Sequence, residues 1–218
     1  ADGLPLYSRE GDTVVTGWAG SNHITGGSED QTITTYGYND VIYTGAGNNI
    51  VYAGAGNDMI YSGSGNNFLQ GGKGSDTYVF AKGHGQDIVS DNGDAPNGNI
   101  RSVNIVDTIK FTDVNFAEAK FARDGNNLII FDYNGSDQVT IEKIISDQNY
   151  RIDVFQFADR KVTLNELWAD GLPLYSREGD TVVTGWAGSN HITGGSEDQT
   201  ITTHGYNDVI YTGAGNNI

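Results

Sequence analysis

Four nine-residue segments follow one another without a gap between Thr44 and Val79: TGAGNNIVY, AGAGNDMIY, SGSGNNFLQ and GGKGSDTYV. Each begins with a glycine-containing stretch, carries Asn or Asp at its sixth position and has a large apolar residue at its eighth. The same frame extends back to Ser8 through SREGDTVVT, GWAGSNHIT, GGSEDQTIT and TYGYNDVIY. A short fixed period of this kind predicts a solenoid in which each repeat is one structural unit.

The eighth position is apolar in all eight segments, at Val15, Ile24, Ile33, Ile42, Val51, Ile60, Leu69 and Tyr78. Glycines in the first four positions suit a tight turn, and the last three positions suit a short strand whose middle side chain points inward. If position eight faces inward and two repeats make one coil, these residues form two facing ladders. Burying each contributes about 1.5–3 kcal/mol, whereas ordering roughly 70 residues costs about 1–2 kcal/mol each. The coils therefore need another source of stability.

The repeat resembles the RTX, or haemolysin-type calcium-binding, nonapeptide GGxGxDxUx. The match is best over Thr44–Val79 and looser over Ser8–Tyr43, where Thr35–Tyr43 has its glycine at the third position. The resemblance implies an all-β fold, a parallel β-roll with two nonapeptides per coil. It also implies Ca²⁺ ions between stacked turns, held by position-six side chains and by backbone carbonyls of the turns.

The position-six residues lie on two edges of the roll, because turns 18 residues apart stack on one another. One edge carries Asn22, Asp40, Asp58 and Asp76, and the other carries Thr13, Gln31, Asn49 and Asn67. Calcium prefers hard, charged oxygens, and stacked carboxylates repel one another without a cation. We therefore expect the strongest sites at the Asp40/Asp58 and Asp58/Asp76 pairs. The resemblance implies backbone carbonyl ligands from Tyr36, Tyr38, Gly54, Gly56, Gly72 and Gly74.

Weaker candidate sites surround these two pairs. The Asn22/Asp40 pair offers one carboxylate, and the Asn49/Asn67 edge offers neutral oxygens. For that second edge, an amide ladder with hydrogen bonds along the stack is the alternative to calcium.

The repeat pattern continues past Val79. KGHGQDIVS, at Lys82–Ser90, has Asp87 at its sixth position, and Asp107 precedes Ile109 after a loop expected over 91–102. Further candidate pairs are then Asn67/Asp87 and Asp76/Asp107.

A longer period of 168 residues is also present, since Ala169–Ile218 repeats Ala1–Ile50 with a single change, Tyr36 to His204. This near-identity predicts a tandem array. We expect a leader and β-roll over 1–90, a loop and a C-terminal β capping segment over 91–168, and a truncated second copy of 1–50 over 169–218. Asp208, the copy of Asp40, has Asn190 as its stacked neighbour, so we expect weak organisation by calcium there.

Residues 107–168 resemble the haemolysin-type calcium-binding-related segment that often follows such repeats, through DTIKFTDVNF, FARDGNNLIIF, QVTIEKI, YRIDVFQFAD and KVTLNEL. Residues 128–132 and 138–143 flank Asn134–Gly135 and predict a hairpin. Residues 151–157 and 161–164 predict two more strands, and Thr163 with Glu166 predicts a helix capping box.

This segment is expected to cap the open end of the roll and to join it to the next unit. We also expect it to cover the outward apolar side chains of the roll, with another copy or a target surface as the alternative. These side chains are Val41, Tyr43, Ile50, Tyr52, Met59, Tyr61 and Phe68.

The composition and the motifs that are missing argue against several classes of function. The net charge of −16, from 28 acidic and 12 basic residues, argues against nucleic-acid binding. Cysteine is absent, no apolar run approaches the roughly 20 residues of a membrane span, and no HExxH, GxSxG or P-loop motif occurs.

We therefore expect no enzymatic activity, but a calcium-folded structural unit of a large secreted or bacterial surface RTX protein. An adhesin-like array is the main interpretation, with calcium, neighbouring copies and a self-association or cell-surface target as partners. The alternative is the calcium-binding C-terminal region of a type I-secreted toxin or hydrolase whose catalytic domain lies elsewhere.

Overall fold

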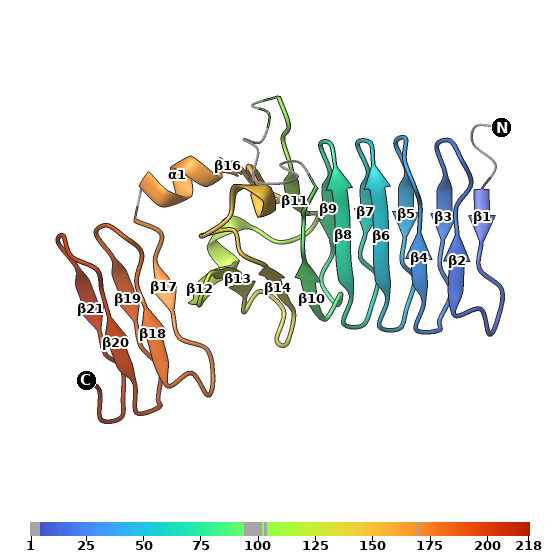
Figure 1. The fold of residues 1–218 in the computed structure, drawn as a ribbon. Helices are drawn as coiled ribbons and strands as arrows, with labels where there is room; N and C mark the ends of the chain where they lie inside the picture. Colours follow the sequence, from blue (N-terminus) through green and yellow to red (C-terminus); the bar gives the residue numbers. More distant parts are fainter. Residues whose placement is uncertain (1–4, 94–101, 103, 170) are drawn as a thin grey trace.

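The computed structural model describes residues 5–93, 102, 104–169 and 171–218, and its regular structure is almost entirely β (Figure 1). Short strands alternate between two sheets of eight strands each. The first sheet contains, in spatial order, β1 (Pro5–Tyr7), β3 (His23–Thr25), β5 (Val41–Tyr43), β7 (Met59–Tyr61), β9 (Thr77–Phe80), β11 (Thr108–Phe111), β15 (Val154–Gln156) and β16 (Lys161–Thr163). The second contains β12 (Lys120–Asp124), β13 (Asn127–Phe131), β14 (Gln138–Ile141), β10 (Gln86–Val89), β8 (Phe68–Lys73), β6 (Ile50–Ala55), β4 (Thr32–Thr34) and β2 (Val14–Thr16).

The register of the parallel strands confirms two nonapeptides per coil. In the first sheet Ile24 pairs with Ile42, Ile42 with Ile60 and Ile60 with Tyr78. In the second sheet the corresponding ladder is Val15, Ile33, Val51 and Leu69. All eight side chains are buried between the sheets, so the fold is a parallel β-solenoid with position eight as its core.

Both ladders continue beyond the eighth repeat. Val89 pairs with Leu69, and Ile109 pairs with Tyr78 across a longer connection. Much of the loop expected over 91–102 lies outside the described residues. The division of the chain at residue 90 stays a prediction, because parallel pairing runs on without a break into β14 and β15.

The C-terminal segment ends the stack with antiparallel strands. The predicted hairpin is confirmed as β13 and β14, the two further strands are β15 and β16, and β12 adds an outer strand that was not predicted. The capping box is confirmed at α1 (Leu164–Ala169): the Thr163 N–H donates to Glu166 Oε2 at 2.7 Å, and the Glu166 N–H donates to Thr163 Oγ1 at 3.2 Å. Two 3-10 helices, Phe116–Glu118 and Gln148–Tyr150, lie between strands.

Large aromatic side chains replace the aliphatic ladders in this end of the molecule. The Phe111 ring lies 5.8 Å from Phe80 and 5.2 Å from Phe157, centroid to centroid. Phe116 and Phe121 pack on the same group. The segment thus has a wider hydrophobic core than the roll that precedes it.

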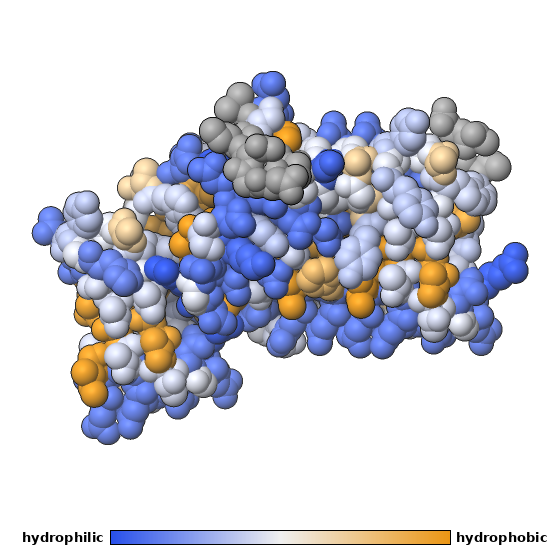
Figure 2. All heavy atoms as spheres, in the orientation of Figure 1, coloured by the Kyte–Doolittle hydropathy of each residue, from blue (hydrophilic) through white to orange (hydrophobic). Residues whose placement is uncertain are grey.

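The outer apolar side chains of the roll are not covered, so that expectation was wrong. Tyr43 is 37% exposed and Tyr52 is 40% exposed, because the C-terminal segment stacks on the end of the roll rather than folding over its faces (Figure 1). Tyr43 instead stacks on Tyr61, with ring centroids 4.3 Å apart. Figure 2 shows apolar side chains gathered along one face of the roll.

The second copy begins the same coil again. Its strands are β17 (Leu174–Tyr175), β18 (Val182–Thr184), β19 (His191–Thr193), β20 (Thr200–Thr202) and β21 (Val209–Tyr211), arranged as β17-β19-β21 and β18-β20. It lies at the opposite end of the molecule from β1 (Figure 1). Among the described residues, none of the helices has the length and apolar character that crossing a membrane requires.

Candidate metal centre

Position six lies directly before each strand of the first sheet, on one edge of the roll. Asp40, Asp58 and Asp76 precede β5, β7 and β9, and all three side chains are buried. Each therefore lies between its own turn and the turns of the adjacent coils. The structure brings together the three aspartates that the repeat spacing predicted to stack.

One oxygen of each carboxylate is used in a ladder along the stack. The Asp40 N–H donates to Asp58 Oδ1 at 2.8 Å, and the Asp58 N–H donates to Asp76 Oδ1 at 2.8 Å. The second oxygens, Asp40 Oδ2 and Asp58 Oδ2, are buried without a hydrogen-bond partner. A buried polar atom without a partner costs about 1–3 kcal/mol, and more if it is charged, so these atoms need an explanation.

The opposite edge of the roll has the same ladder with amides in place of carboxylates. The Gln31 N–H donates to Asn49 Oδ1, and the Asn49 N–H donates to Asn67 Oδ1, both at 2.9 Å. Here the second atom is a nitrogen, and it has partners. Asn49 Nδ2 donates to the carbonyls of Ala46 and Gly47 in its own turn, at 3.1 and 3.0 Å, and to Asn67 Oδ1 at 3.1 Å.

Asn67 repeats this arrangement one coil later. Its Nδ2 points to the carbonyls of Gly63 and Gly65, both at 3.5 Å, and to Asp87 Oδ1 at 2.9 Å. On this edge the predicted alternative, an amide ladder, is what the structure contains. The space between these turns thus already holds an N–H donor, and calcium binding by Asn49 and Asn67 stays a prediction.

Compared with the amide edge, the aspartate turns lack a hydrogen-bond donor at the second side-chain atom of position six. Asp58 has a buried oxygen, Oδ2, as its second side-chain atom, where Asn49 has a nitrogen that donates to two turn carbonyls and to the position-six oxygen of the next coil. By the repeat, the corresponding partners of Asp58 Oδ2 would all be acceptors. A cation satisfies this set, and carboxylate and carbonyl oxygens are the ligands that Ca²⁺ prefers. The residues present therefore fit calcium.

The turn carbonyls are directed along the stack. A Cβ added at Gly56 would collide with the carbonyl oxygen of Tyr38, and one at Gly74 would collide with that of Gly56. Tyr38 itself has a φ of 72°, the left-handed conformation that the fourth position of this turn requires. The backbone thus keeps the space between adjacent turns free of side-chain bulk.

Sequence comparison matches four stretches of the chain, residues 25–60, 34–69, 55–86 and 193–218, to the family of the RTX calcium-binding nonapeptide repeat. These stretches are RTX calcium-binding nonapeptide repeats. The chain is thus a calcium-binding repeat protein.

The chain is also similar to the iron-regulated protein FrpA of Neisseria meningitidis serogroup C, with 34% identity over 126 residues. That alignment covers 56% of this chain and 11% of the relative. The RTX chain described here thus spans about a tenth of the length of the curated relative that it matches.

The burial and charge of the RTX aspartate ladder change the pKa of Asp58. Burial raises the pKa of Asp58 to about 7, against the lowering effect of the Asp40 N–H, and the negative charge of Asp40 raises it further. A bound divalent cation has the opposite effect and favours the ionised carboxylate.

Asn22 has a hydrogen-bonded side-chain amide, and its role as a calcium ligand stays a prediction. Its Nδ2 donates to the carbonyls of Trp18 and Gly20 in its own turn, at 3.0 and 2.7 Å, and to Asp40 Oδ1 at 2.9 Å. The amide group thus takes the place that an ion takes in an aspartate turn. The turn of Asn22 in the first coil is thus joined to Asp40 by hydrogen bonds.

Both oxygens of Asp87 have protein partners, and its role as a calcium ligand stays a prediction. Oδ1 accepts from the N–H and Nδ2 of Asn67, at 2.7 and 2.9 Å. Oδ2 accepts from Ser62 Oγ at 2.8 Å and lies 2.6 Å from His84 Nδ1. His84 is buried, and its Nε2 lies 2.6 Å from the Tyr133 hydroxyl. The repeat pattern did not indicate Tyr133, which comes from the C-terminal segment.

In the second copy, Asp208 is only partly buried. Its Oδ1 accepts from the N–H and Nδ2 of Asn190, at 2.8 and 2.9 Å, and the hydrogen bond from the Asn190 side chain lowers the pKa of Asp208. Asn190 Nδ2 also donates to the carbonyls of Trp186 and Gly188. Weak organisation by calcium at Asp208 stays a prediction.

The Asp76 turn differs from the others at its far side. The Asp76 N–H donates to Asp107 Oδ1 at 2.7 Å, so Asp107 continues the ladder as the spacing predicted. The structure adds Asp91, which the repeat pattern did not indicate and which lies beside these two residues.

Proposed function

We propose that this chain is a non-catalytic structural unit of a large secreted or surface-exposed RTX protein, and that calcium folds it outside the cell. The observation that carries the calcium part is the contrast at position six. The amide nitrogens of one edge have hydrogen-bond partners, whereas the second oxygens of Asp40 and Asp58 have none.

The proposed ligands belong to three successive turns. Asp40 would act with the carbonyls of Tyr36 and Tyr38, Asp58 with those of Gly54 and Gly56, and Asp76 with those of Gly72 and Gly74. In each site the position-six carboxylate of the following coil would lie on the other side of the ion. This assignment follows Asn67, whose Nδ2 points to the position-two and position-four carbonyls of its own turn and to Asp87 Oδ1. In the Asn49 turn the contacted carbonyls are those of positions three and four.

Calcium would drive folding by mass action. A ligand that binds only the folded state adds RT ln(1 + [L]/Kd), about 4 kcal/mol for each site at a thousandfold excess over Kd. Without the ion, buried carboxylates one coil apart oppose stacking. The resemblance to RTX proteins implies type I secretion of an unfolded chain from low calcium into the millimolar calcium of the exterior, where weak extracellular sites fill.

The arrangement of the second copy supports a tandem array. Trp186 is 9% exposed, whereas Trp18, its counterpart in the first copy, is 51% exposed. The Trp186 ring lies 4.6 Å from that of Trp168 and 5.6 Å from the Arg123 guanidinium. Arg123 also donates to the carbonyl of Gly185. A preceding unit would cover the Trp18 surface in the same way.

Far-UV circular dichroism with a chelator and then with added calcium tests calcium-driven folding. We expect the β signal of the roll to appear with calcium and to be lost again with the chelator. A spectrum that the chelator leaves unchanged would count against the proposal. The chain should also show no turnover.

The full-length gene separates the array from the alternative function. Many units of 168 residues would support a structural array. A single upstream catalytic domain would instead support the calcium-binding C-terminal region of a toxin or hydrolase.

A further inference from the structure

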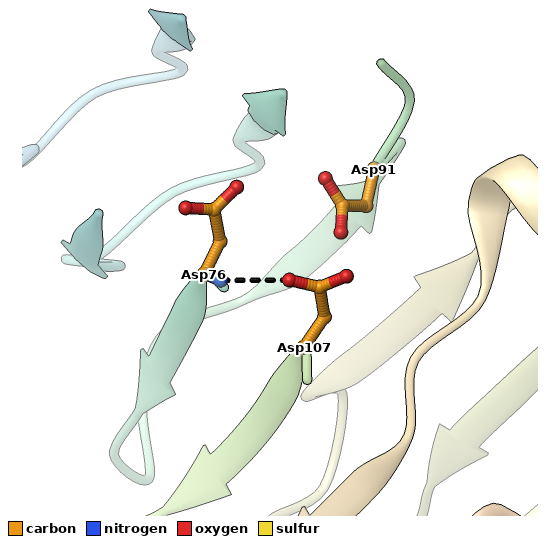
Figure 3. Close-up of side chains that lie close together, drawn as sticks. All are labelled: Asp76, Asp91 and Asp107. Carbon is orange, nitrogen blue, oxygen red and sulfur yellow. Dashed lines mark hydrogen bonds between the residues drawn. The ribbon is translucent and has the colours of Figure 1, made fainter. Parts of the chain in front are cut away.

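Three buried aspartates from separate parts of the chain converge where the roll meets the C-terminal segment. Asp76 lies before β9, Asp91 follows β10 and Asp107 lies before β11 (Figure 3). One carboxylate oxygen from each lies within 4.8 Å of the others. Two oxygens that bind one Ca²⁺ at 2.3–2.6 Å cannot be more than about 5 Å apart, so the spacing suits a single ion.

Asp91 has an oxygen that faces this cluster without a partner. Its Oδ1 accepts from the Gly72 N–H at 3.2 Å, which holds the side chain against the Asp76 turn. Its Oδ2 is buried and has no hydrogen-bond partner, and the whole residue is 2% exposed. A buried carboxylate oxygen in a group of acceptors indicates a missing cation or proton.

The position of Asp91 in the repeat sets this cluster apart from the ladder. Asp91 follows the strand of Lys82–Ser90 and so takes the first position of the next turn. On the same edge, the first position is held by Gly17, Thr35, Ala53 and Gly71. A first-position carboxylate is therefore an addition to the repeat pattern, and it gives this turn a third acidic side chain.

We propose that Asp91 completes a calcium site of three carboxylates with Asp76 and Asp107. The inference rests on the proposed function, because it extends the calcium ladder by one site of different composition. Higher ligand charge tightens calcium binding, so this site should fill before the two-carboxylate sites of the roll.

The location gives the site a structural consequence. Asp91 and Asp107 flank the connection of residues 92–106, and Asp76 belongs to the last glycine-rich turn on the aspartate edge before it. An ion shared by the three would fix both ends of that connection against the roll. Calcium would then link the folding of the roll to the folding of the C-terminal segment.

Charge supports the same conclusion. Burial raises the pKa of Asp91, and the nearby carboxylates of Asp107 and Asp76 raise it further. The cluster thus disfavours three negative charges without a bound cation, whereas calcium would allow all three carboxylates to ionise.

Calcium titration of the full chain by calorimetry tests the inference. Asp91→Asn should lose one ion per chain from the tightest class and raise the Kd of that class at least about tenfold. Asp30→Asn is the matched control, because Asp30 is exposed and its Oδ1 accepts only from the Asn48 N–H, which an amide oxygen preserves. In the same titration, Asp58→Asn tests the two-carboxylate sites of the roll.

If Asp91→Asn binds as many ions as Asp30→Asn with the same affinity, the inference is wrong, and loss at Asp58→Asn would leave the proposed function standing. If the unmodified chain binds no calcium, both the inference and the proposed function fail.

Thermal melting in a chelator distinguishes a calcium ligand from a residue that only supports the fold. A ligand role predicts that Asp91→Asn melts at or above the unmodified chain there, and equal destabilisation with and without calcium would overturn it.

Discussion

In the turn before β7, the second carboxylate oxygen of Asp58 takes the place that an amide nitrogen holds in Asn49. Asn49 Nδ2 lies among turn carbonyls and a position-six oxygen of the next coil, whereas Asp58 Oδ2 is buried without a hydrogen-bond partner. The amide nitrogen donates hydrogen bonds to these acceptors. A carboxylate oxygen cannot donate, so it needs a cation between itself and the acceptors. In the proposed function, one atom per turn would thus separate a calcium-dependent edge from a calcium-independent edge.

Substitution at Asp58 should therefore depend on what replaces it. Asp58→Asn should reduce calcium binding yet stabilise the calcium-free chain, because the new Nδ2 can donate to the turn carbonyls. Asp58→Ala should raise the calcium concentration needed for folding by about tenfold, since it removes ligands from two sites. The measurement is the calcium midpoint of folding by circular dichroism.

Asn49→Ala is the matched substitution on the amide edge. It should cost about 1–3 kcal/mol of stability by leaving buried carbonyls unsatisfied, with little change in the number of calcium ions bound. Equal effects of Asp58→Ala and Asn49→Ala on calcium-driven folding would show that the two edges had been assigned wrongly.

The raised pKa of Asp58 predicts a pH dependence. The pKa is about 7 in the folded chain and about 3.9 in an unfolded one. Without calcium, the protonated side chain thus favours folding fully below about pH 4, and this contribution is lost as pH rises through about 7. Calcium must displace the proton, so its affinity should rise between about pH 6 and pH 8. Titrations across this range should show a smaller rise for Asp58→Asn, and an unchanged slope would contradict the assignment.

At the scale of strands and turns, the period determined most of what could be predicted. A fixed spacing places one apolar residue at the centre of each three-residue strand and one polar residue before it. The ladders of Val15 and Ile24 and the column of Asp40, Asp58 and Asp76 follow directly from that spacing. In the C-terminal segment local alternation predicted the β13–β14 hairpin, but not its parallel pairing with β10.

The errors arose where contacts come from outside the period. At Asp87 the period indicated the position-six carboxylate but not the buried hydrogen-bond network that His84 and Tyr133 form beside it. Asp91 was overlooked because its candidate role in a metal site depends on the fold, which places it beside Asp76 and Asp107. The exposure of Tyr43 could not be predicted either, because the repeat fixes which side chains face outward but not what covers them.

For the whole molecule, the same fifty residues occur in two environments. In the first copy the Trp18 surface is open, and in the second the C-terminal segment of the preceding unit covers it. Calcium would hold coils together within each unit, whereas the Trp168, Trp186 and Arg123 contacts would hold successive units together. An array built this way gains a hydrophobic joint at every repeat of the unit.

The two tryptophans provide an internal control for that joint. Trp186→Ala should cost about 3–5 kcal/mol at the joint, as large aromatic truncations do, and should reduce amide-exchange protection in β17–β21. Trp18→Ala makes the same chemical change on an exposed surface and should leave β2–β5 protected. If both variants exchange alike, the joint does not stabilise the second copy.

The most direct test of calcium between stacked aspartate turns is an anomalous difference map from crystals grown with calcium. We predict a peak beside Asp58 Oδ2 and the carbonyls of Gly54 and Gly56, at about 2.3–2.6 Å from each oxygen, with equivalent peaks at Asp40 and Asp76. No peak should lie beside Asn49 or Asn67. Aspartates without metal at these turns, or peaks of equal height along the amide edge, would contradict the account.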